Sequence, residues 1–541
     1  MRLLLLFTLF VTSLWSSPIT EQLQANIQNE SGIVKALYSM NNDKPLWIGH
    51  ANNFHTFMKA IQTPYYNYKN KRFELDTIEQ YTHLLRNDMD ESQNSYELAL
   101  LDIALTKSYI ELANFIVQSD IDWDLVQAKL AGLKESKDIK ANWEMIRKPL
   151  PSANQLFSAL VNQNINGFYK SLTPLPDRHA DLINGLYKYQ NFQNIVKLSY
   201  GEDLQYGDTN ARIPDIKERL AASGDFPRQA TYSDKFDDKL KEAMNLYKDR
   251  FNLDMNGKID KVMIFYLNKP AEPLIKSIIT NLDKLKVFPD RFPSEVAIIN
   301  IPDFNLDYYK NGYSVATMNT VVGRAERPTP IFSSEMNSIV LNPTWTVPDN
   351  LVRRDLIKAL KENPNYMNEH NMLIYQGWKN NSPIKNFDIS KLLAYEDPKT
   401  GSIPYRVVQT PGDDNALGRV KFSFPNKYDV YLHDTDNKEL LDRRYRIYSS
   451  GCMRLQNPFQ FVDMIKDKFQ NGAGNKIDQY VQSGKTITVA LRNPLPIQTT
   501  YFTVFARNGH IYFRKDIYGY DKLIEESVKG SSTVSSNNIL Y

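Results

Sequence analysis

The residues best suited to chemistry lie close together in the last third of the chain. Cys452 is the only cysteine among 541 residues, and Gly451 precedes it directly. His433 lies nineteen residues earlier, at the end of an apolar stretch that predicts a strand. A cysteine nucleophile reacts as the thiolate, and an imidazole can take the thiol proton and later return it to a leaving amine. The pair predicts covalent acyl transfer, with Cys452 as nucleophile and His433 as base.

The backbone around the cysteine suits the same chemistry. Gly451 has no side chain, so a substrate can approach its backbone closely. The amides of Gly451 and Cys452 are candidate donors to an oxyanion that develops during acyl transfer. Spacing alone is weak evidence, because a lone cysteine is more often a buried, inert residue. The alternative from the residues alone is therefore a structural cysteine.

Charged and polar side chains flank this pair. Arg454 follows the cysteine by two positions and can clamp a carboxylate of a substrate. Tyr431 and Thr435 share a strand face with His433 if the strand continues, because strand side chains alternate. Either residue contacts the substrate or packs. A second arginine group is interpreted as a solvated connection between strands, and it consists of Arg443, Arg444 and Arg446.

The stretch from His433 to Arg454 resembles the catalytic motif of the L,D-transpeptidase family, of the YkuD type. In that motif a histidine is followed by Ser/Thr-His-Gly-Cys and then an arginine. Ser450 stands here where the family usually has histidine, a departure that bears on the orientation of Cys452 and not on the base. A Ser-Ser-Gly-Cys form also occurs in the large multidomain branch of the family. The resemblance covers most of residues 45–521, and it includes residues 321–334, 342–348, 415–422 and 516–521.

The resemblance implies a two-step reaction on peptidoglycan. The Cys452 thiolate attacks a tetrapeptide stem, D-Ala leaves with a proton from His433, and a stem amine resolves the thioester into a 3-3 cross-link. Water as acceptor would make the protein an L,D-carboxypeptidase, and a lipoprotein lysine is a further acceptor. A non-catalytic scaffold that binds the cell wall is the alternative of another class. The implied substrate-binding residues are Arg454, Tyr431, Thr435 and Ser450, beside the catalytic residues Cys452, His433 and Gly451.

Composition narrows the class of protein. Hydrophobic residues make up 42% of the chain and charged residues 23%, which is ordinary for a folded protein. The net charge is +3 and no long run of Lys and Arg occurs, so nucleic acid is not an expected partner. No histidine or carboxylate cluster has metal-ligand spacing, so no metal or organic cofactor is expected.

Residues 1–17 read as an export signal. Met1-Arg2 supplies a positive start, an apolar stretch follows, and the small residues Ser16 and Ser17 precede Pro18. The apolar stretch is shorter than the roughly 20 residues that span a bilayer. We expect a periplasmic or cell-envelope protein, associated with the inner membrane or the wall. An uncleaved N-terminal anchor is the alternative.

Periodicity divides the rest of the chain, and the predicted fold class is multidomain α+β. Residues 18–204 show apolar positions at three- and four-residue steps, which predicts a helical scaffold domain. Residues 205–268 resemble a small helical peptidoglycan-binding-like domain. Residues 290–521 show strand patterns and a hairpin turn at Asn311-Gly312, which predicts a mainly-β catalytic domain. Within it, residues 353–401 predict a helical insertion that caps the site, and residues 522–541 a mostly flexible tail.

Overall fold

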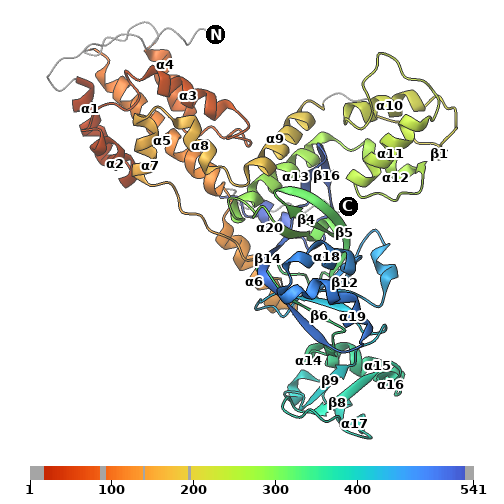
Figure 1. The fold of residues 1–541 in the computed structure, drawn as a ribbon. Coiled ribbons are helices and arrows are strands. Elements are labelled where there is room, and N and C mark those ends of the chain that lie inside the picture. Colours follow the sequence, from red (N-terminus) through yellow and green to blue (C-terminus); the bar gives the residue numbers. More distant parts are fainter. Residues whose placement is uncertain (1–17, 86–92, 138–140, 193–196, 530–541) are drawn as a thin grey trace. The chain divides into compact units, whose positions relative to one another are not determined.

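The computed structural model describes residues 18–85, 93–137, 141–192 and 197–529 (Figure 1). The predicted signal at residues 1–17 and the end of the predicted tail therefore lie outside the described residues. Within the described ranges, no helix is both long enough and apolar enough to span a membrane. The chain forms two compact units. Of the described residues, the first unit contains those up to Val126, those within Met145–Phe292 and those from Thr503 onward, and the second contains those within Gln127–Glu144 and Pro293–Phe502.

The N-terminal part of the first unit is helical, as the periodicity predicted. Its central helix α5 (Ser95–Gln118) buries most of its residues. Asp102 in this helix is fully buried and accepts the backbone amides of Leu46, Trp47 and Ile48 at 2.9–3.0 Å, which satisfies its charge without a cation. The other helices are α1 (Pro18–Asn26), α2 (Gly32–Met40), α3 (Ala51–Gln62), α4 (Leu75–Leu84), α6 (Trp123–Lys137), α7 (Ala153–Val161), α8 (Ile165–Leu172) and α9 (Pro176–Gln190), and the boundary at Val126 lies in α6.

A small helical region follows from residue 204. It contains α10 (Ile213–Ala222), α11 (Asp238–Arg250) and α12 (Lys261–Leu267), with β1 (Leu204–Gln205) antiparallel to β2 (Lys258–Ile259). Asp237 and Asp260 cap α11 and α12, because each carboxylate accepts a backbone amide of the first turn. The buried Arg250 pairs with the buried Asp225 inside the first unit. The starts of α11 and α12 are local features, because each is set by an aspartate directly before the helix.

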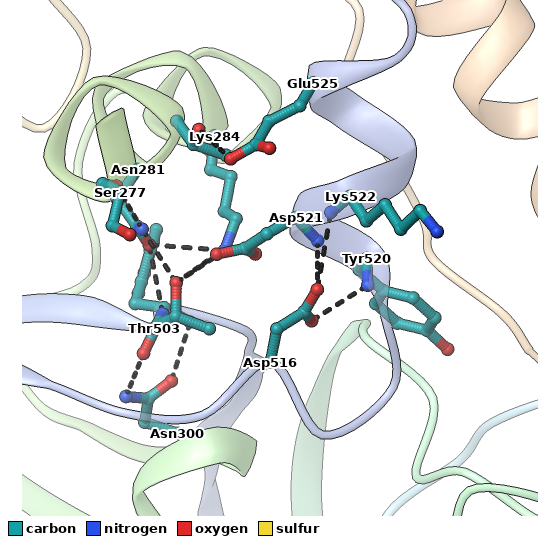
Figure 2. A network of polar contacts seen from close by, with 12 residues as sticks. Ser277, Asn281, Lys284, Asn300, Thr503, Asp516, Tyr520, Asp521, Lys522 and Glu525 are labelled. Carbon is teal, nitrogen blue, oxygen red and sulfur yellow. Dashed lines mark hydrogen bonds and ion pairs between the residues drawn. The ribbon is translucent and has the colours of Figure 1, made fainter. Parts of the chain in front are cut away.

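The C-terminal segment of the first unit is tied to helix α13 (Ala271–Lys284) by a polar network that Figure 2 shows. The segment contains β15 (Val504–Arg507), β16 (His510–Phe513) and α20 (Tyr520–Glu525). Asp521 pairs with the fully buried Lys284. Thr503 donates to Asp521 and accepts from Asn281 at 2.8 Å. Helix α20 extends into the region, 522–541, that the sequence predicted to be a mostly flexible tail, so the first residues of that region are helical.

One mixed sheet organises the second unit. Its strand order is β12-β5-β13-β11-β10-β6-β14-β3-β4, and β4 also pairs with β5, so the sheet closes on itself. Helices α18 (Pro458–Met464) and α19 (Ile477–Gln482) belong to the same unit. The strands are β3 (Val296–Asn300), β4 (Asn305–Lys310), β5 (Tyr313–Gly323), β6 (Ser333–Leu341), β10 (Val420–Ser423), β11 (Leu432–His433), β12 (Ile447–Ser449), β13 (Met453–Leu455) and β14 (Ile487–Thr500).

The insertion in this unit has its own apolar core and its own small sheet, of order β7-β9-β8. Its strands are β7 (Trp345–Thr346), β8 (Met372–Gln376) and β9 (Tyr405–Gln409). Its helices are α14 (Asp349–Leu351), a π-helical turn at Val352–Leu356, α15 (Ile357–Glu362), α16 (Tyr366–Glu369) and α17 (Ser390–Leu393). Strands β7 and β9 lie outside the predicted bounds of the insertion, 353–401, and within those bounds the sequence predicted helices and not strand β8. Strand β8 was missed because five residues with apolar side chains on both faces show no alternation.

Candidate active site

Three neighbouring strands of the large sheet, β10, β11 and β13, position the candidate site, with His433 in β11 and Cys452 directly before β13. In the antiparallel pair β10–β11, Lys421 lies opposite His433. In the parallel pair β11–β13, His433 lies opposite Arg454. Leu432 and Met453 alternate with these positions and are buried in the hydrophobic core. Because strand side chains alternate, the histidine and the two cations share the other face of the sheet.

Cys452 lies on this same face. It immediately precedes Met453, whose amide donates to the carbonyl of Tyr431 at 3.0 Å. The parallel register therefore sets Cys452 beside Tyr431, one step along the sheet from the pair of His433 and Arg454. The rings of Tyr431 and His433 are 5.6 Å apart. Cys452, directly before β13, and His433, in β11, thus occupy diagonal positions.

The environment of His433 keeps its imidazole neutral. Burial lowers the pKa of His433 to about 3, and the positive charges of Arg454 and Lys421 act in the same direction. A hydrogen bond with the backbone of Asp434 opposes this fall in the pKa. A neutral imidazole is the form that can accept a proton, and His433 is in that form at neutral pH.

The thiol of Cys452 is held in its protonated form at rest. Burial raises the pKa of Cys452, which is the largest effect on this group. Hydrogen bonds from the backbone and hydroxyl of Tyr431, and the charges of Lys421 and Arg454, oppose this rise. These groups favour the thiolate once it forms. The site therefore suits proton transfer during attack and not a permanent thiolate–imidazolium pair.

A buried serine closes the turn that carries the cysteine. The Ser449 hydroxyl donates to the Cys452 carbonyl at 2.6 Å and accepts the Gly451 amide at 3.1 Å. Thr329 donates to the Gly451 carbonyl at 2.9 Å. Gly451 has φ +114°, a conformation that side chains disfavour. Because its amide is already bonded to Ser449, Gly451 can act as an oxyanion donor only after that hydroxyl moves.

The side chain of Ser450 forms a hydrogen bond with a basic residue outside the turn that carries Cys452. Arg327 donates to the Ser450 hydroxyl at 2.8 Å through Nη1. The same nitrogen pairs with Asp355, in the π-helical turn of the insertion, at 2.9 Å. Arg327 thus connects the insertion to the turn beside Cys452. Sequence gave no reason to single out Arg327.

Two other residues singled out in the sequence, Thr435 and Arg446, have different roles in the structure. Thr435 is buried and accepts a hydrogen bond from Arg454 Nη1 at 3.3 Å, so it holds the arginine in place. Arg446 is buried and donates to the carbonyls of Thr320 and Phe304, which makes it part of the scaffold of the sheet. The solvated connection predicted for the arginine group therefore does not describe Arg446. Burial of this residue cannot be read from three closely spaced arginines.

Sequence reasoning missed two further side chains of the site. Lys421 alternates with the core residues Val420 and Phe422, and that alternation is a signal that places it on the face of His433. Ser449 carried no such signal, because its role depends on the fold of the turn. No group of three or more histidine, cysteine, aspartate or glutamate residues in the described ranges could hold a metal ion.

Known proteins resemble the chain in two regions. Residues 294–486 match the YkuD family, described as the L,D-transpeptidase catalytic domain, and residues 32–186 match the Scaffold domain family. A Haemophilus influenzae protein named "Putative L,D-transpeptidase" is 32% identical over 266 residues, which are 49% of this chain and 52% of that protein. The chain thus spans about half the length of the curated relative that it matches.

Two solved structures show weaker similarity. An L,D-transpeptidase from Mycobacterium smegmatis is 12% identical, with 38% of this chain and 58% of that chain covered and a TM-score of 0.18. A second L,D-transpeptidase, from Stackebrandtia nassauensis, is 11% identical, with 57% and 99% covered and a TM-score of 0.21.

Proposed function

We propose that this protein is a cysteine L,D-transpeptidase that forms 3-3 cross-links in peptidoglycan. Residues 294–486 match the YkuD family of L,D-transpeptidase catalytic domains, and residues 32–186 match the Scaffold domain family. The observation that carries the proposal is the diagonal placement of Cys452 and His433 on one face of the sheet. Tyr431 and Arg454 stand beside them on that face. Together they supply a nucleophile, a neutral base and a cation for the carboxylates of a stem peptide.

In the first step the sulfur of Cys452 attacks the carbonyl carbon of the third residue of a tetrapeptide stem. The thiol proton passes to the imidazole of His433 as the sulfur–carbon bond forms. The carbon–nitrogen bond to D-Ala then breaks, and the amine leaves with that proton. Arg454 and Lys421 disfavour a charged imidazole, so His433 holds the proton only briefly. A thioester on Cys452 remains.

In the second step the side-chain amine of another stem attacks the thioester. The imidazole of His433 takes a proton from this amine, and the Cys452 thiolate leaves as the new amide forms. The hydrogen bond from Tyr431 favours that thiolate. Arg454, fixed by Thr435, is the cation that we assign to a carboxylate of the stem peptide. Such a substrate is found outside the cytoplasm, so we place the protein in the cell envelope, exported by residues 1–17.

The products of the reaction test the proposal. Purified protein is mixed with disaccharide tetrapeptide, and the products are separated and identified by mass spectrometry. We expect a cross-linked dimer that has lost one D-Ala, and none with Cys452→Ala. Tripeptide alone would show instead that water is the acceptor and that the protein is an L,D-carboxypeptidase. Tetrapeptide that stays unchanged would contradict both enzymatic assignments for this substrate.

A further inference from the structure

Lys421 leans along the sheet toward the nucleophile. Its register partner in β11 is His433, yet its ammonium lies 4.1 Å from the centroid of the Tyr431 ring. Tyr431 is two residues before His433 on the same face, and it is the residue beside Cys452. The side chain of Lys421 therefore points away from His433 and toward Tyr431, the residue beside Cys452.

The other cation of this face bends the opposite way. Arg454 also has His433 as register partner, but its Nη1 donates to Thr435, two residues after the histidine. From the level of His433, one cation thus reaches toward Cys452 and the other toward Thr435. The two positive charges therefore lie at different places on this face, one near the sulfur of Cys452 and one near Thr435.

The half-buried ammonium of Lys421 must be stabilised by its surroundings. Among the described residues, no carboxylate contributes to the shifted pKa of Lys421, and burial of a cation without a carboxylate partner is costly. The face of the Tyr431 ring offsets part of that cost. Burial lowers the pKa of Lys421, and the charge of Cys452 raises it. The same charge pair opposes the rise in the pKa of Cys452.

We propose that Lys421 is the cation that stabilises the Cys452 thiolate, acting beside Tyr431, while Arg454 is left to bind the substrate. The inference rests on the proposed function in that Cys452 is the nucleophile. It assigns Lys421 to both steps, because negative charge develops on the sulfur as the thiol loses its proton in the first and as the sulfur leaves in the second. The charged and titratable groups that face Cys452 are Lys421 on β10, Tyr431 and His433 on β11, and Arg454 on β13.

The reactivity of the single cysteine tests this without any peptidoglycan substrate. The rate of alkylation of Cys452 by iodoacetamide is measured against pH in the full-length protein and in Lys421→Met. Removal of a unit charge that acts on the thiol should raise its pKa by about one unit, so the midpoint of the curve should move about one pH unit upward. At a fixed pH below the midpoint, the variant should react about tenfold more slowly.

Two variants serve as controls. Lys421→Arg keeps the charge and should restore the curve to that of the unchanged protein. Lys427→Met removes a lysine that also lies over a tyrosine ring, Tyr428, at 5.3 Å, and should leave the curve where it is. If Lys421→Met does not fold, as judged by circular dichroism, Lys421→Gln is measured in its place.

Superimposed curves for the folded neutral variant and the unchanged protein would overturn the inference. An equal shift in Lys421→Arg would do so as well, because charge would then not be the cause. The proposed function fails separately. An absence of cross-linked product from the unchanged protein would count against that function, while a shifted alkylation curve would still assign Lys421 to the thiolate.

Discussion

Ser449 and Gly451 share a hydrogen bond in which the Gly451 amide donates to the Ser449 hydroxyl at 3.1 Å. The same hydroxyl donates to the carbonyl of Cys452 at 2.6 Å. One buried side chain therefore closes the turn on both sides of the nucleophile. It also occupies the Gly451 amide, a candidate donor to an oxyanion.

Replacement of Ser449 by alanine should slow the reaction through misplacement of Cys452. We expect kcat to fall by about tenfold to a hundredfold with a smaller change in KM, since loss of orientation acts on the chemical step. The free energy of unfolding should fall by about 1–3 kcal/mol, because a buried carbonyl loses its donor. Steady-state kinetics and denaturant unfolding measure both effects. Ser449→Thr keeps the hydroxyl and is the control, and a fully active Ser449→Ala would show that the turn does not depend on this bond.

The low pKa of His433 predicts an unusual pH dependence. In the free enzyme the base stays deprotonated down to a pH of about 3, so kcat/KM should show no acid limb from His433 between pH 7 and 5. His433→Ala should lower kcat/KM by about 10²–10⁴-fold, the usual contribution of a positioned base. An acid limb near pH 6.5 that disappears in a His433 variant would contradict the neutral, buried imidazole.

The lowered pKa of His433 also predicts that the folded protein loses stability as the pH falls. An unfolded histidine has a pKa of about 6.5, and burial lowers that of folded His433 to about 3. Below pH 6.5 the unfolded chain binds the proton and the folded chain does not. The contribution of His433 is therefore full above pH 6.5 and is lost as the pH falls toward 3. Denaturant unfolding of His433→Asn between pH 7 and 4 should show a weaker loss of stability with falling pH, and an identical loss would argue against the shift.

Arg327 should couple the insertion to the cysteine turn. Its Nη1 contacts both Asp355 in the insertion and Ser450 beside Gly451. We expect Arg327→Ala to reduce kcat/KM by about tenfold, from loss of positioning, and to increase hydrogen exchange at Val352–Leu356. Asp355→Asn weakens only the contact to the insertion and should reproduce the exchange without the full kinetic loss. Equal kinetic losses in the two variants would show that Ser450 is not positioned by Arg327.

Asp521 should be a strong determinant of stability in the first unit. It pairs with Lys284, whose side chain is fully buried, so Asp521→Ala leaves a buried charge without this partner. Breaking a buried pair in this way costs about 3–5 kcal/mol. The matched control is Lys276→Ala, which removes an exposed ion pair with Glu525 between the same two helices and should cost less than about 1 kcal/mol. Similar unfolding midpoints for the two variants would mean that the buried pair contributes little.

Local sequence signals predicted much of this structure, and long-range register accounts for what they missed. The turn at Asn311-Gly312 and the helical pattern of α5 depend on neighbouring residues, and both appear as predicted. The diagonal placement of Cys452 and His433 followed from a motif. The lean of Lys421 and Arg454 in opposite directions did not, because it depends on which residues β11 presents to its two neighbours. A hydroxyl such as that of Ser449 likewise gains its role only when the turn has folded.

Cys452 carries the acyl group in the proposed reaction, and intact-protein mass spectrometry detects such an adduct. The protein is mixed with disaccharide tetrapeptide, quenched in acid at early times and weighed, beside Cys452→Ala treated in the same way. We predict an added mass equal to the substrate minus D-Ala on the unchanged protein, mapped by fragmentation to Cys452, and no added mass on the variant. Turnover without an adduct, or an adduct that persists in Cys452→Ala, would contradict the account.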